Sequence, residues 1–323
     1  SGSNLTSAAK LISDDAQTNR IVAIDFSDSA SVISQAFEVV QNAKVTAVRL
    51  YPNSSTLNIT GAQYADTAAL NKVKGVFDLV VRDAAAVQAA DLQADSLVDS
   101  FAITSSTTNI GNKLPDLLPM SKLSQINVVQ DNVKMTLTMT DFNNFQSELS
   151  KVSGSYGLKL TEVKVSDLID VIGKNNIAAL DIQDTSSAIA NGWNDLVALG
   201  SKITSIDDST PTINLAITYE QWKQSASTLS KLNSGQPLAL LDVRPADATT
   251  ASGLANVNSV SVYGTPGEVA YSFDDLVALG AALDDIELSS DGVISLTQQQ
   301  VDADANGDTI GKINGEFSIE ISA

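Results

Sequence analysis

Residues 302–308 form the most specific candidate for a chemical site in this chain. They read Asp302-Ala-Asp304-Ala-Asn306-Gly-Asp308, with side-chain oxygens at alternate positions around a glycine. Calcium-binding loops begin with the same D-x-[DN]-x-[DN]-G pattern, because Ca²⁺ binds several oxygen ligands. The pattern is incomplete, since Ile313 stands where such a loop carries a bidentate carboxylate. The sequence therefore predicts either a bound Ca²⁺ or a diverged helix start with solvated acidic side chains.

Paired acidic residues are the second candidate. They stand at Asp14-Asp15, Asp207-Asp208, Asp274-Asp275 and Asp284-Asp285. Most glycosidases use two carboxylates beside a cleft as their catalytic residues. These pairs fall at expected helix starts and turns, where the helix dipole and local hydrogen bonds already explain acidic residues. We therefore expect no catalysis from them, and only Asp207, Asp208, Asp284 and Asp285 remain as candidates for Ca²⁺ coordination.

The residue types that are missing exclude most catalytic plans. The chain contains no His and no Cys, which excludes a Ser-His-Asp triad, a Cys nucleophile and the usual zinc, copper and haem-His sites. Neither the Walker loop G-x-x-x-x-G-K-[ST] nor the dinucleotide fingerprint G-x-G-x-x-G occurs. We expect a protein that is not an enzyme and has no cofactor, with a bound Ca²⁺ as the alternative.

The charge of the chain limits its partners. Its 38 Asp and Glu against 19 Lys and Arg give a net charge of −19, whereas nucleic acids and anionic membranes need clustered Lys and Arg. No apolar run reaches the roughly 18 residues that a membrane span requires. We expect no nucleic-acid partner and no membrane insertion.

Three aromatic residues are candidates for stacking on a sugar ring. Trp193 aligns with Phe273 in a repeated segment and is therefore assigned to the core. Tyr219 and Trp222, at the start of an expected helix, remain as glycan candidates. The polar strand faces that carry Thr136 and Thr138 need no ligand, because exposed strands prefer β-branched residues.

The elements that position these residues recur with a period of about 79 residues. Two apolar strand positions recur at Ile24, Ile103, Ile182 and Val262, and at Val48, Ile126, Ile206 and Ile286. A Lys before a branched aliphatic residue recurs at Lys72, Lys151, Lys231 and Lys312, each with Leu or Ile seven residues later. Such fixed offsets indicate four diverged copies of one repeat.

The hydrophobic period within one copy alternates between 2 and 3.6, which predicts alternating strands and helices. In the first copy we expect strands at 21–26, 45–50, 56–60 and 77–82 and helices at 30–42, 62–74 and 84–97. Turn-forming residues at 51–55, and at 130–132, 207–211 and 289–292 in the other copies, predict a hairpin at each junction. The unit is therefore βαββαβ followed by a connecting helix. Pro115 and Pro119 predict a shortened or broken first helix in the second copy.

The predicted fold class is α/β with helices on one face of the sheet, because the strands alternate apolar and polar residues. Two architectures satisfy this pattern: a continuous array of four copies, or tandem ferredoxin-like modules. The connecting segments 84–97, 164–176 and 246–256 are apolar-patterned, which favours the array.

The domain assignment follows the repeat. Residues 1–20 are read as a tag remnant and the end of a preceding repeat, and the copies as 21–99, 100–177, 178–256 and 257–323, the last without a connecting helix. A start within a unit predicts that the chain is cut from a longer protein.

Residues 195–218 resemble a known class of repeat. They contain Asp-Leu-Val-Ala-Leu-Gly, Ile-Thr-Ser-Ile-Asp and Thr-Pro-Thr-Ile-Asn-Leu-Ala-Ile-Thr in that order. The segment resembles repeats of very large secreted bacterial surface proteins and adhesins, which are often exported by type I secretion together with calcium-binding repeats. The resemblance implies an extracellular, cell-surface location and provides no catalytic residues.

Two functions remain open at this point. The first is a non-catalytic structural or adhesive segment of a large bacterial cell-surface or matrix protein, which acts as a spacer, adhesin or surface-layer element. Its partners are then other copies of the chain or neighbouring repeats. The alternative is a carbohydrate- or protein-binding module of a secreted protein, whose partner is a surface glycan or protein. A glycan array distinguishes the two.

Overall fold

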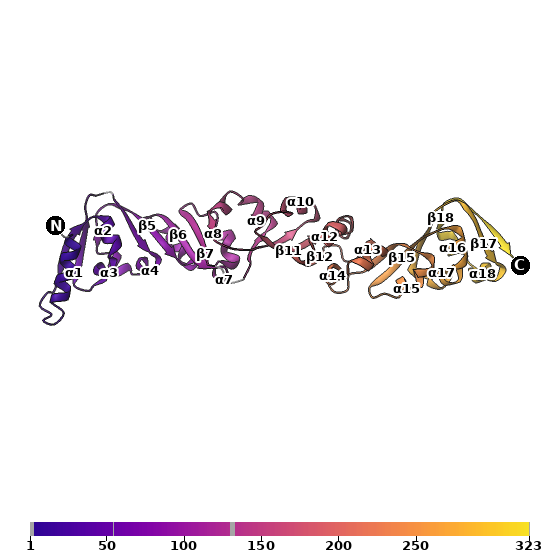
Figure 1. Cartoon of the computed structure of the whole chain (residues 1–323), viewed down its shortest axis with the longest axis horizontal. Coiled ribbons are helices and arrows are strands. Elements are labelled where there is room, and N and C mark those ends of the chain that lie inside the picture. The colour runs from indigo at the N-terminus through magenta and orange to yellow at the C-terminus, as the bar shows by residue number, and fades with distance from the viewer. Residues whose placement is uncertain (1–2, 54, 130–132, 323) are drawn as a thin grey trace. The chain divides into compact units, whose positions relative to one another are not determined.

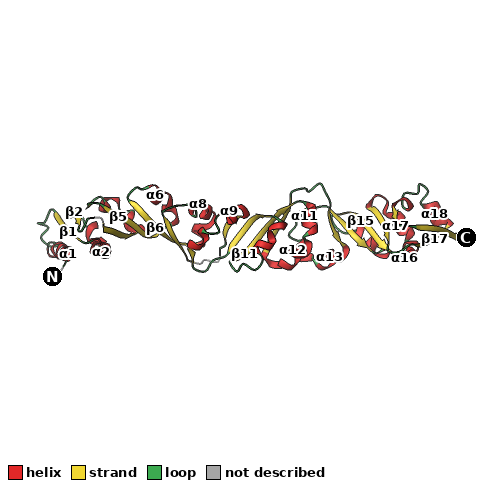
Figure 2. Cartoon of the chain, turned by 90° about the horizontal axis from the view of Figure 1, so that it is seen from above, coloured by secondary structure: helices red, strands yellow, loops and turns green. Residues whose placement is uncertain are grey.

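The computed structural model describes residues 3–53, 55–129 and 133–322. The chain forms two compact units, residues 1–159 and 160–323. In each unit, strands alternate with short helices along the chain (Figures 1 and 2). No helix in the described part of the chain has the length and apolarity needed to cross a membrane.

Short elements make up the first unit. Its strands are β1 (Ile24–Asp28), β2 (Val45–Leu50), β3 (Ser55–Thr60), β4 (Val73–Lys74), β5 (Phe77–Ala84), β6 (Val98–Ser106), β7 (Leu123–Val129), β8 (Met135–Thr138) and β9 (Val152–Ser153). Its helices are α1 (Asn4–Asp14), α2 (Ala30–Gln35), α3 (Phe37–Gln41), α4 (Gly61–Tyr64), α5 (Thr67–Leu70), α6 (Ala89–Ala94), α7 (Thr107–Ile110), α8 (Leu114–Leu117) and α9 (Met139–Asn144).

The second unit repeats this pattern. Its strands are β10 (Leu158–Val163), β11 (Ile177–Asp184), β12 (Ile203–Asp208), β13 (Leu215–Thr218), β14 (Leu238–Val243), β15 (Val257–Gly264), β16 (Leu283–Leu288), β17 (Gly292–Thr297), β18 (Ile313–Asn314) and β19 (Phe317–Ser322). Its helices are α10 (Leu168–Val171), α11 (Ser186–Asn191), α12 (Trp193–Leu199), α13 (Tyr219–Gln224), α14 (Ala226–Leu229), α15 (Ala248–Ser252), α16 (Pro266–Tyr271), α17 (Phe273–Leu279) and α18 (Gln298–Ala303).

The strands form several parallel sheets, so the predicted α/β class is confirmed. In the first unit the sheet orders are β1-β2-β4 and β3-β5-β6-β7-β9. In the second unit β10, β11 and β12 are neighbours in one sheet, and the orders β13-β14-β15-β16-β18 and β17-β19 describe two more. The ladders whose register is described are all parallel, for example Ile103 against Ile126 between β6 and β7. Parallel neighbours require crossover connections, which the helices provide.

One face of each central strand is buried and the other is not. Along β6, Val98, Phe101 and Ile103 are buried while the residues between them are partly or fully exposed. The buried face packs against apolar residues of neighbouring helices, such as Leu92 of α6 and Ile110 of α7, which are also fully buried. This alternation is what the strand pattern predicted.

The predicted hairpins are wrong where the structure describes them. Strands β2 and β3 flank residues 51–55, yet β2 pairs with β1 and β4, whereas β3 pairs with β5 in another sheet. The ferredoxin-like alternative is wrong as well, because it requires antiparallel pairing and the described ladders are parallel. Turn-forming residues only mark where a strand ends, and here the chain moves to a new sheet. Residues 130–132 lie outside the described residues.

Glycines in the left-handed region mark a second kind of sheet change. Gly75, Gly154 and Gly315 have φ of +119°, +98° and +109°. They lie in the turns between β4 and β5, between β9 and β10, and between β18 and β19. Glycine adopts this φ without steric cost. Each turn lets one stretch of chain leave one sheet and enter the next.

The helices are shorter than predicted. The expected helix 30–42 is interrupted at Ala36, where φ is −137°, and forms α2 and α3. In the second copy α8 has four residues, with Pro115 in its first turn, and it ends before Pro119. Proline is tolerated only in the first turn of a helix, which explains this short element.

Candidate functional site

The acidic segment 302–308 closes a loop at the end of α18. Asp302 lies in the helix and accepts a hydrogen bond from Gln298 Nε2 at 2.8 Å. Asp304 is 7% exposed, and its two carboxylate oxygens accept the backbone N–H groups of Thr309 and Ile310 at 2.9 and 3.0 Å. Asn306 and Asp308 are exposed. Asp304 is therefore turned inward to the backbone of its own loop.

Asp15 makes the same contacts at the other end of the chain. Its carboxylate accepts the backbone N–H groups of Arg20 and Ile21, also five and six residues later, at 2.7 and 2.8 Å. Lys44 Nζ and Thr18 Oγ1 each donate to it at 2.6 Å. The ammonium of Lys44, followed by these hydrogen bonds, holds the pKa of Asp15 well below its usual range.

Replacing Asp15 with asparagine is expected to lower stability in a pH-dependent way. A carboxyl whose folded pKa is lowered stabilises the protein above its unfolded pKa of about 4, and this contribution is lost as pH falls towards the folded pKa. The difference between wild type and Asp15→Asn is therefore largest near neutral pH and narrows below pH 4. Urea unfolding from pH 7 to pH 2 measures it. Asp14→Asn is the control, because Asp14 is exposed and forms a surface pair with Lys10. A pH-independent Asp15→Asn difference would contradict the assignment.

The pair Asp207 and Asp208 is split between solvent and core. Asp208 is 4% exposed and accepts hydrogen bonds from Ser186 Oγ, from the backbone N–H and hydroxyl of Thr210, and from Gln236 Nε2. Asp207 is only half-buried and accepts Asn233 Nδ2. The Asp208 carboxylate thus organises a buried polar cluster.

The pair Asp284 and Asp285 also divides. Asp284 is exposed, whereas Asp285 Oδ2 accepts Asn314 Nδ2 at 3.2 Å. Its Oδ1 is buried and has no hydrogen-bond partner in the described part of the chain. The structure does not bring the two pairs or the 302–308 acids together: across the described ranges, no group of three or more Asp or Glu is placed to hold a metal ion. The Ca²⁺ site stays a prediction.

Threonine and serine residues begin the helices at repeated positions. Their hydroxyls accept the backbone N–H three residues later in two series, Ser29, Ser106, Thr185 and Thr265, and Thr60, Thr138, Thr218 and Thr297. In several copies the third residue returns the bond: Gln221 Oε1, for example, accepts the Thr218 N–H at 2.9 Å. Such N-caps satisfy helix donors that otherwise have no partner. These caps could have been predicted from the sequence, because a Thr followed three residues later by Gln is a typical helix start, as at Thr60, Thr218 and Thr297.

The repeated Lys joins one helical segment to the next. Lys72 Nζ donates to the carbonyls of Val40 and Asn42 at 3.0 and 2.9 Å, and Lys231 Nζ donates to Gly200 O at 2.5 Å. These carbonyls lie at or just after the ends of α3 and α12, where carbonyl groups lack intrahelical partners and attract cations. The Lys that recurs in the sequence therefore makes a structural contact with the end of a helix.

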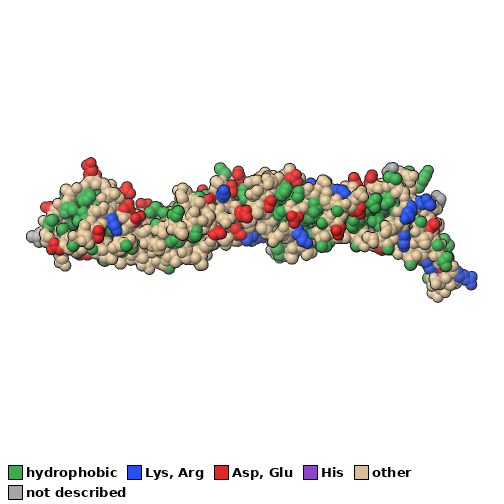
Figure 3. Space-filling model, turned by 180° about the vertical axis from the view of Figure 1, so that it is seen from behind, with side chains coloured by type: hydrophobic (Ala, Val, Ile, Leu, Met, Phe, Trp, Pro, Cys, Tyr) green, Lys and Arg blue, Asp and Glu red, His purple; other side chains and the backbone are tan. Residues whose placement is uncertain are grey.

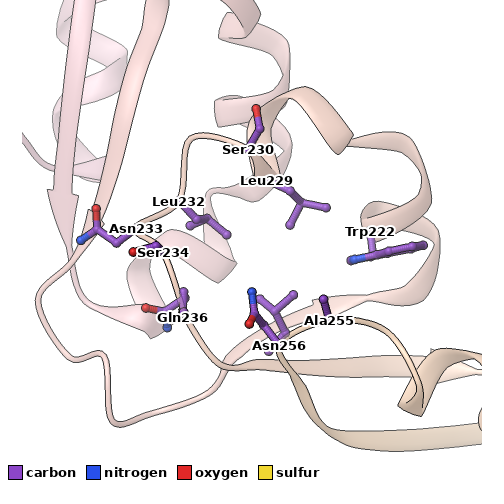
Figure 4. Close-up of a pocket in the computed structure, with 11 residues that line it drawn as sticks. Trp222, Leu229, Ser230, Leu232, Asn233, Ser234, Gln236, Ala255 and Asn256 are labelled. Carbon is purple, nitrogen blue, oxygen red and sulfur yellow. The ribbon is translucent and has the colours of Figure 1, made fainter.

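A pocket of about 340 Å³ lies in the second unit beside α13 and α14. Figure 4 shows Trp222 on one side, Leu229 and Leu232 above, and Asn256 below the same space. Its full lining is Trp222, Leu229, Ser230, Leu232, Asn233, Ser234, Gly235, Gln236, Leu238, Ala255 and Asn256. Gln236 and Leu238 are buried in the wall, while Ser234 and Asn256 are exposed at the rim. We call this space the Trp222 pocket.

A second pocket, of about 330 Å³, occupies the matching place in the first copy. Tyr64 lies four residues after the cap Thr60, as Trp222 does after Thr218. Tyr64 Oη donates to Asp95 Oδ2 at 2.9 Å, and Lys74 also lines the space. Burial, reinforced by the Asp95 carboxylate, raises the pKa of Tyr64 to about 12. We call this space the Tyr64 pocket.

No family model, curated protein or solved structure matches the chain. Its function is therefore inferred from the geometry of its own residues. On the face drawn in Figure 3, acidic side chains are scattered among neutral and hydrophobic ones and do not form one patch. Glu268, one of several acids around a further hollow, is held as a helix cap by Thr265, whose backbone N–H and hydroxyl lower its pKa.

The polar residues described above fall into two groups. The buried acids, the capping hydroxyls and the repeated lysines bind the backbone of their own chain. The Trp222 pocket combines an aromatic ring with neutral polar side chains, an arrangement that suits binding of a small molecule. A further hollow is lined by the acidic residues Glu220, Asp242, Asp247 and Glu268 together with Arg244.

Proposed function

We propose that the chain is a non-catalytic structural and adhesive segment of a large bacterial cell-surface or matrix protein, built as an array of four copies of a unit of about 79 residues. The observation that carries the proposal is the recurrence of helix caps along the whole chain. Thr60, Thr138, Thr218 and Thr297 follow one another at steps of 78 to 80 residues and cap equivalent helices.

Repeated caps support a scaffold because they fix local structure in every copy. Each copy caps two of its helices with its own Thr or Ser, and Lys72, Lys231 and Lys312 each add a bond to the preceding helical segment. Stability in such an array comes from each repeat and from contacts between nearest neighbours. A spacer or adhesin needs this property, since it must stay folded along its length without a large central core.

The location and the adhesive role come from the sequence. The resemblance of residues 195–218 to repeats of secreted surface proteins supports an extracellular segment, and an acidic chain without Cys is compatible with it. Its partners are copies of the same chain, neighbouring repeats or a surface glycan or protein.

Bead detachment under flow tests the adhesive role. Beads coated with the purified chain are placed on surfaces coated with the same chain, with mucin-type glycans or with albumin, with and without Ca²⁺. The chain-coated beads are expected to resist higher shear than albumin-coated beads on at least one of the first two surfaces. Detachment equal to that of albumin beads on every surface would overturn the adhesive role.

A further inference from the structure

We propose that the Trp222 pocket binds a neutral sugar. The inference gives the proposed adhesive function a ligand, and rests on that function only for the biological source of the sugar. The first observation is the charge of the lining. The chain has 38 acidic and 19 basic residues, yet the residues that line this pocket are all uncharged.

An uncharged lining selects among ligand classes. A cationic ligand would need carboxylates and an anionic ligand would need Lys or Arg to replace lost hydration. The Trp222 pocket offers instead the amide of Asn256, the hydroxyl of Ser234 and an indole ring. Asn233 and Ser230 add side-chain oxygens as acceptors, since their donors are bonded to Asp207 and to Ser227 O. Hydroxyl groups match the amides, and the apolar C–H face of a sugar ring matches the indole. Its volume lies at the lower end of the roughly 300–1,000 Å³ typical of ligand pockets, which suits one sugar ring.

Trp222 is held in place from one side. Its ring stacks on Tyr219 with centroids 6.0 Å apart and planes 14° apart, and Lys223 Nζ lies 4.7 Å from the centroid of the Tyr219 ring. Trp222 itself is half-buried. Stacking on a fixed neighbour removes rotamer freedom before any ligand arrives, which lowers the entropic cost of binding.

Hydrogen-bonding groups of the pocket remain available to a ligand. In Figure 4 the indole nitrogen of Trp222 and the amide of Asn256 face the same space. Among the described residues, neither side chain has a hydrogen-bond partner. Asn256 has φ of +65°, a conformation that asparagine tolerates better than most residues. By contrast, the amide nitrogen of Gln236 donates a hydrogen bond to Asp208 Oδ2 at 2.8 Å. Gln236 therefore shapes the pocket wall and does not donate to a ligand.

The Tyr64 pocket provides a matched control within the same chain. It occupies the equivalent place and has nearly the same volume, but its lining contains Lys74 and Asp95. The Tyr64 hydroxyl is already bonded to Asp95. The same backbone frame therefore holds one charged pocket and one neutral pocket, and only the neutral one is assigned to a sugar.

Titration with monosaccharides tests the proposal. The probes are glucose, galactose, mannose and N-acetylglucosamine, with glucosamine and glucuronate as charged controls, and binding is followed by tryptophan emission and ligand-observed NMR. The chain has 2 Trp, and the fully buried Trp193 serves as the internal reference. We expect saturation by at least one neutral sugar with a Kd on the order of 1 mM. Trp222→Ala should weaken binding more than tenfold, and Tyr64→Ala should leave it unchanged.

The outcomes separate this proposal from the proposed function. Asn256→Gly keeps the positive φ, removes the amide and should weaken binding several-fold, so it decides the matter if Trp222→Ala fails to fold by circular dichroism. No saturation by any neutral sugar up to about 50 mM, an unchanged affinity in Asn256→Gly, or tighter binding of a charged probe would overturn the sugar site. Such a result would not overturn the proposed adhesive function, because adhesion between copies of the chain is tested separately by bead detachment.

Discussion

Replacing Trp193 with alanine should lower the free energy of unfolding by about 4 kcal/mol. Trp193 begins α12, is fully buried, and its Nε1 donates to Ser225 Oγ at 3.1 Å. The substitution removes the largest side chain of this core and leaves a cavity. It also removes a donor from Ser225, which itself is 2% exposed. Urea unfolding followed by far-UV circular dichroism measures the loss as a shift in midpoint at constant slope.

Trp193→Phe is the matched variant, because Phe273 occupies the equivalent position in the fourth copy and is also fully buried. It should cost about 1–2 kcal/mol, from the smaller ring and the lost hydrogen bond. Trp222→Ala is the second control and should cost less than about 1 kcal/mol, since that ring is half-buried. Equal losses in Trp193→Ala and Trp222→Ala would contradict the core assignment.

The strands could be predicted from sequence better than their partners. The expected strand 45–50 has the same bounds as β2, and 56–60 differs from β3 by one residue. Alternation reports which face of a strand is buried, so it locates strands wherever one face is covered. It does not report the neighbour. The polar residues 51–55 suit a hairpin and a passage between two sheets equally well, and the sequence offered no means to separate them.

The acidic residues illustrate what a motif leaves out. The sequence shows that Asp304 carries a carboxylate at a suitable spacing for Ca²⁺. It does not show that the chain turns back so that the N–H groups of Thr309 and Ile310 reach that carboxylate. Asp15 has no calcium-like motif and makes the same contacts. Loop closure of this kind depends on backbone geometry, which residue spacing alone does not determine.

The Trp222 pocket was only partly accessible to sequence reasoning. Trp222 could be singled out as an aromatic residue at a helix start with no core counterpart. The opposite wall comes from Ala255 and Asn256, which follow the next strand and helix along the chain. Only the parallel pairing of β14 with β15 brings that turn beside α14 and its following loop. The aromatic residue was predictable, whereas its polar partners required the fold.

Asp208→Ala should lower the free energy of unfolding by about 3–5 kcal/mol, because it strips the acceptor from a buried cluster of donors. Ser186, Gln236 and Asp208 are 1%, 4% and 4% exposed, so water cannot readily replace the lost bonds. Urea unfolding of the variant measures the loss. Asp207→Ala is the neighbouring control and should change stability by less than about 1 kcal/mol, as expected for a partly solvated carboxylate.

The other copies show how this cluster can be removed without the same loss. The residue at the end of β12 is Asp208, whereas Leu50 and Leu288 end β2 and β16, and Ala30 stands where α11 begins with Ser186. Asp208→Leu alone should still destabilise, since Thr210 loses its acceptor and Ser186 and Gln236 keep only backbone carbonyl acceptors such as Ile213 O, at 3.0 and 3.4 Å. Adding Ser186→Ala and Gln236→Phe, with phenylalanine as at position 77 of the first copy, should recover most of the stability, because a complete apolar replacement of a buried charged cluster is often neutral or favourable. A triple variant no more stable than Asp208→Leu would contradict this expectation. It would show that the cluster contributes more to stability than the hydrogen bonds among its own polar groups.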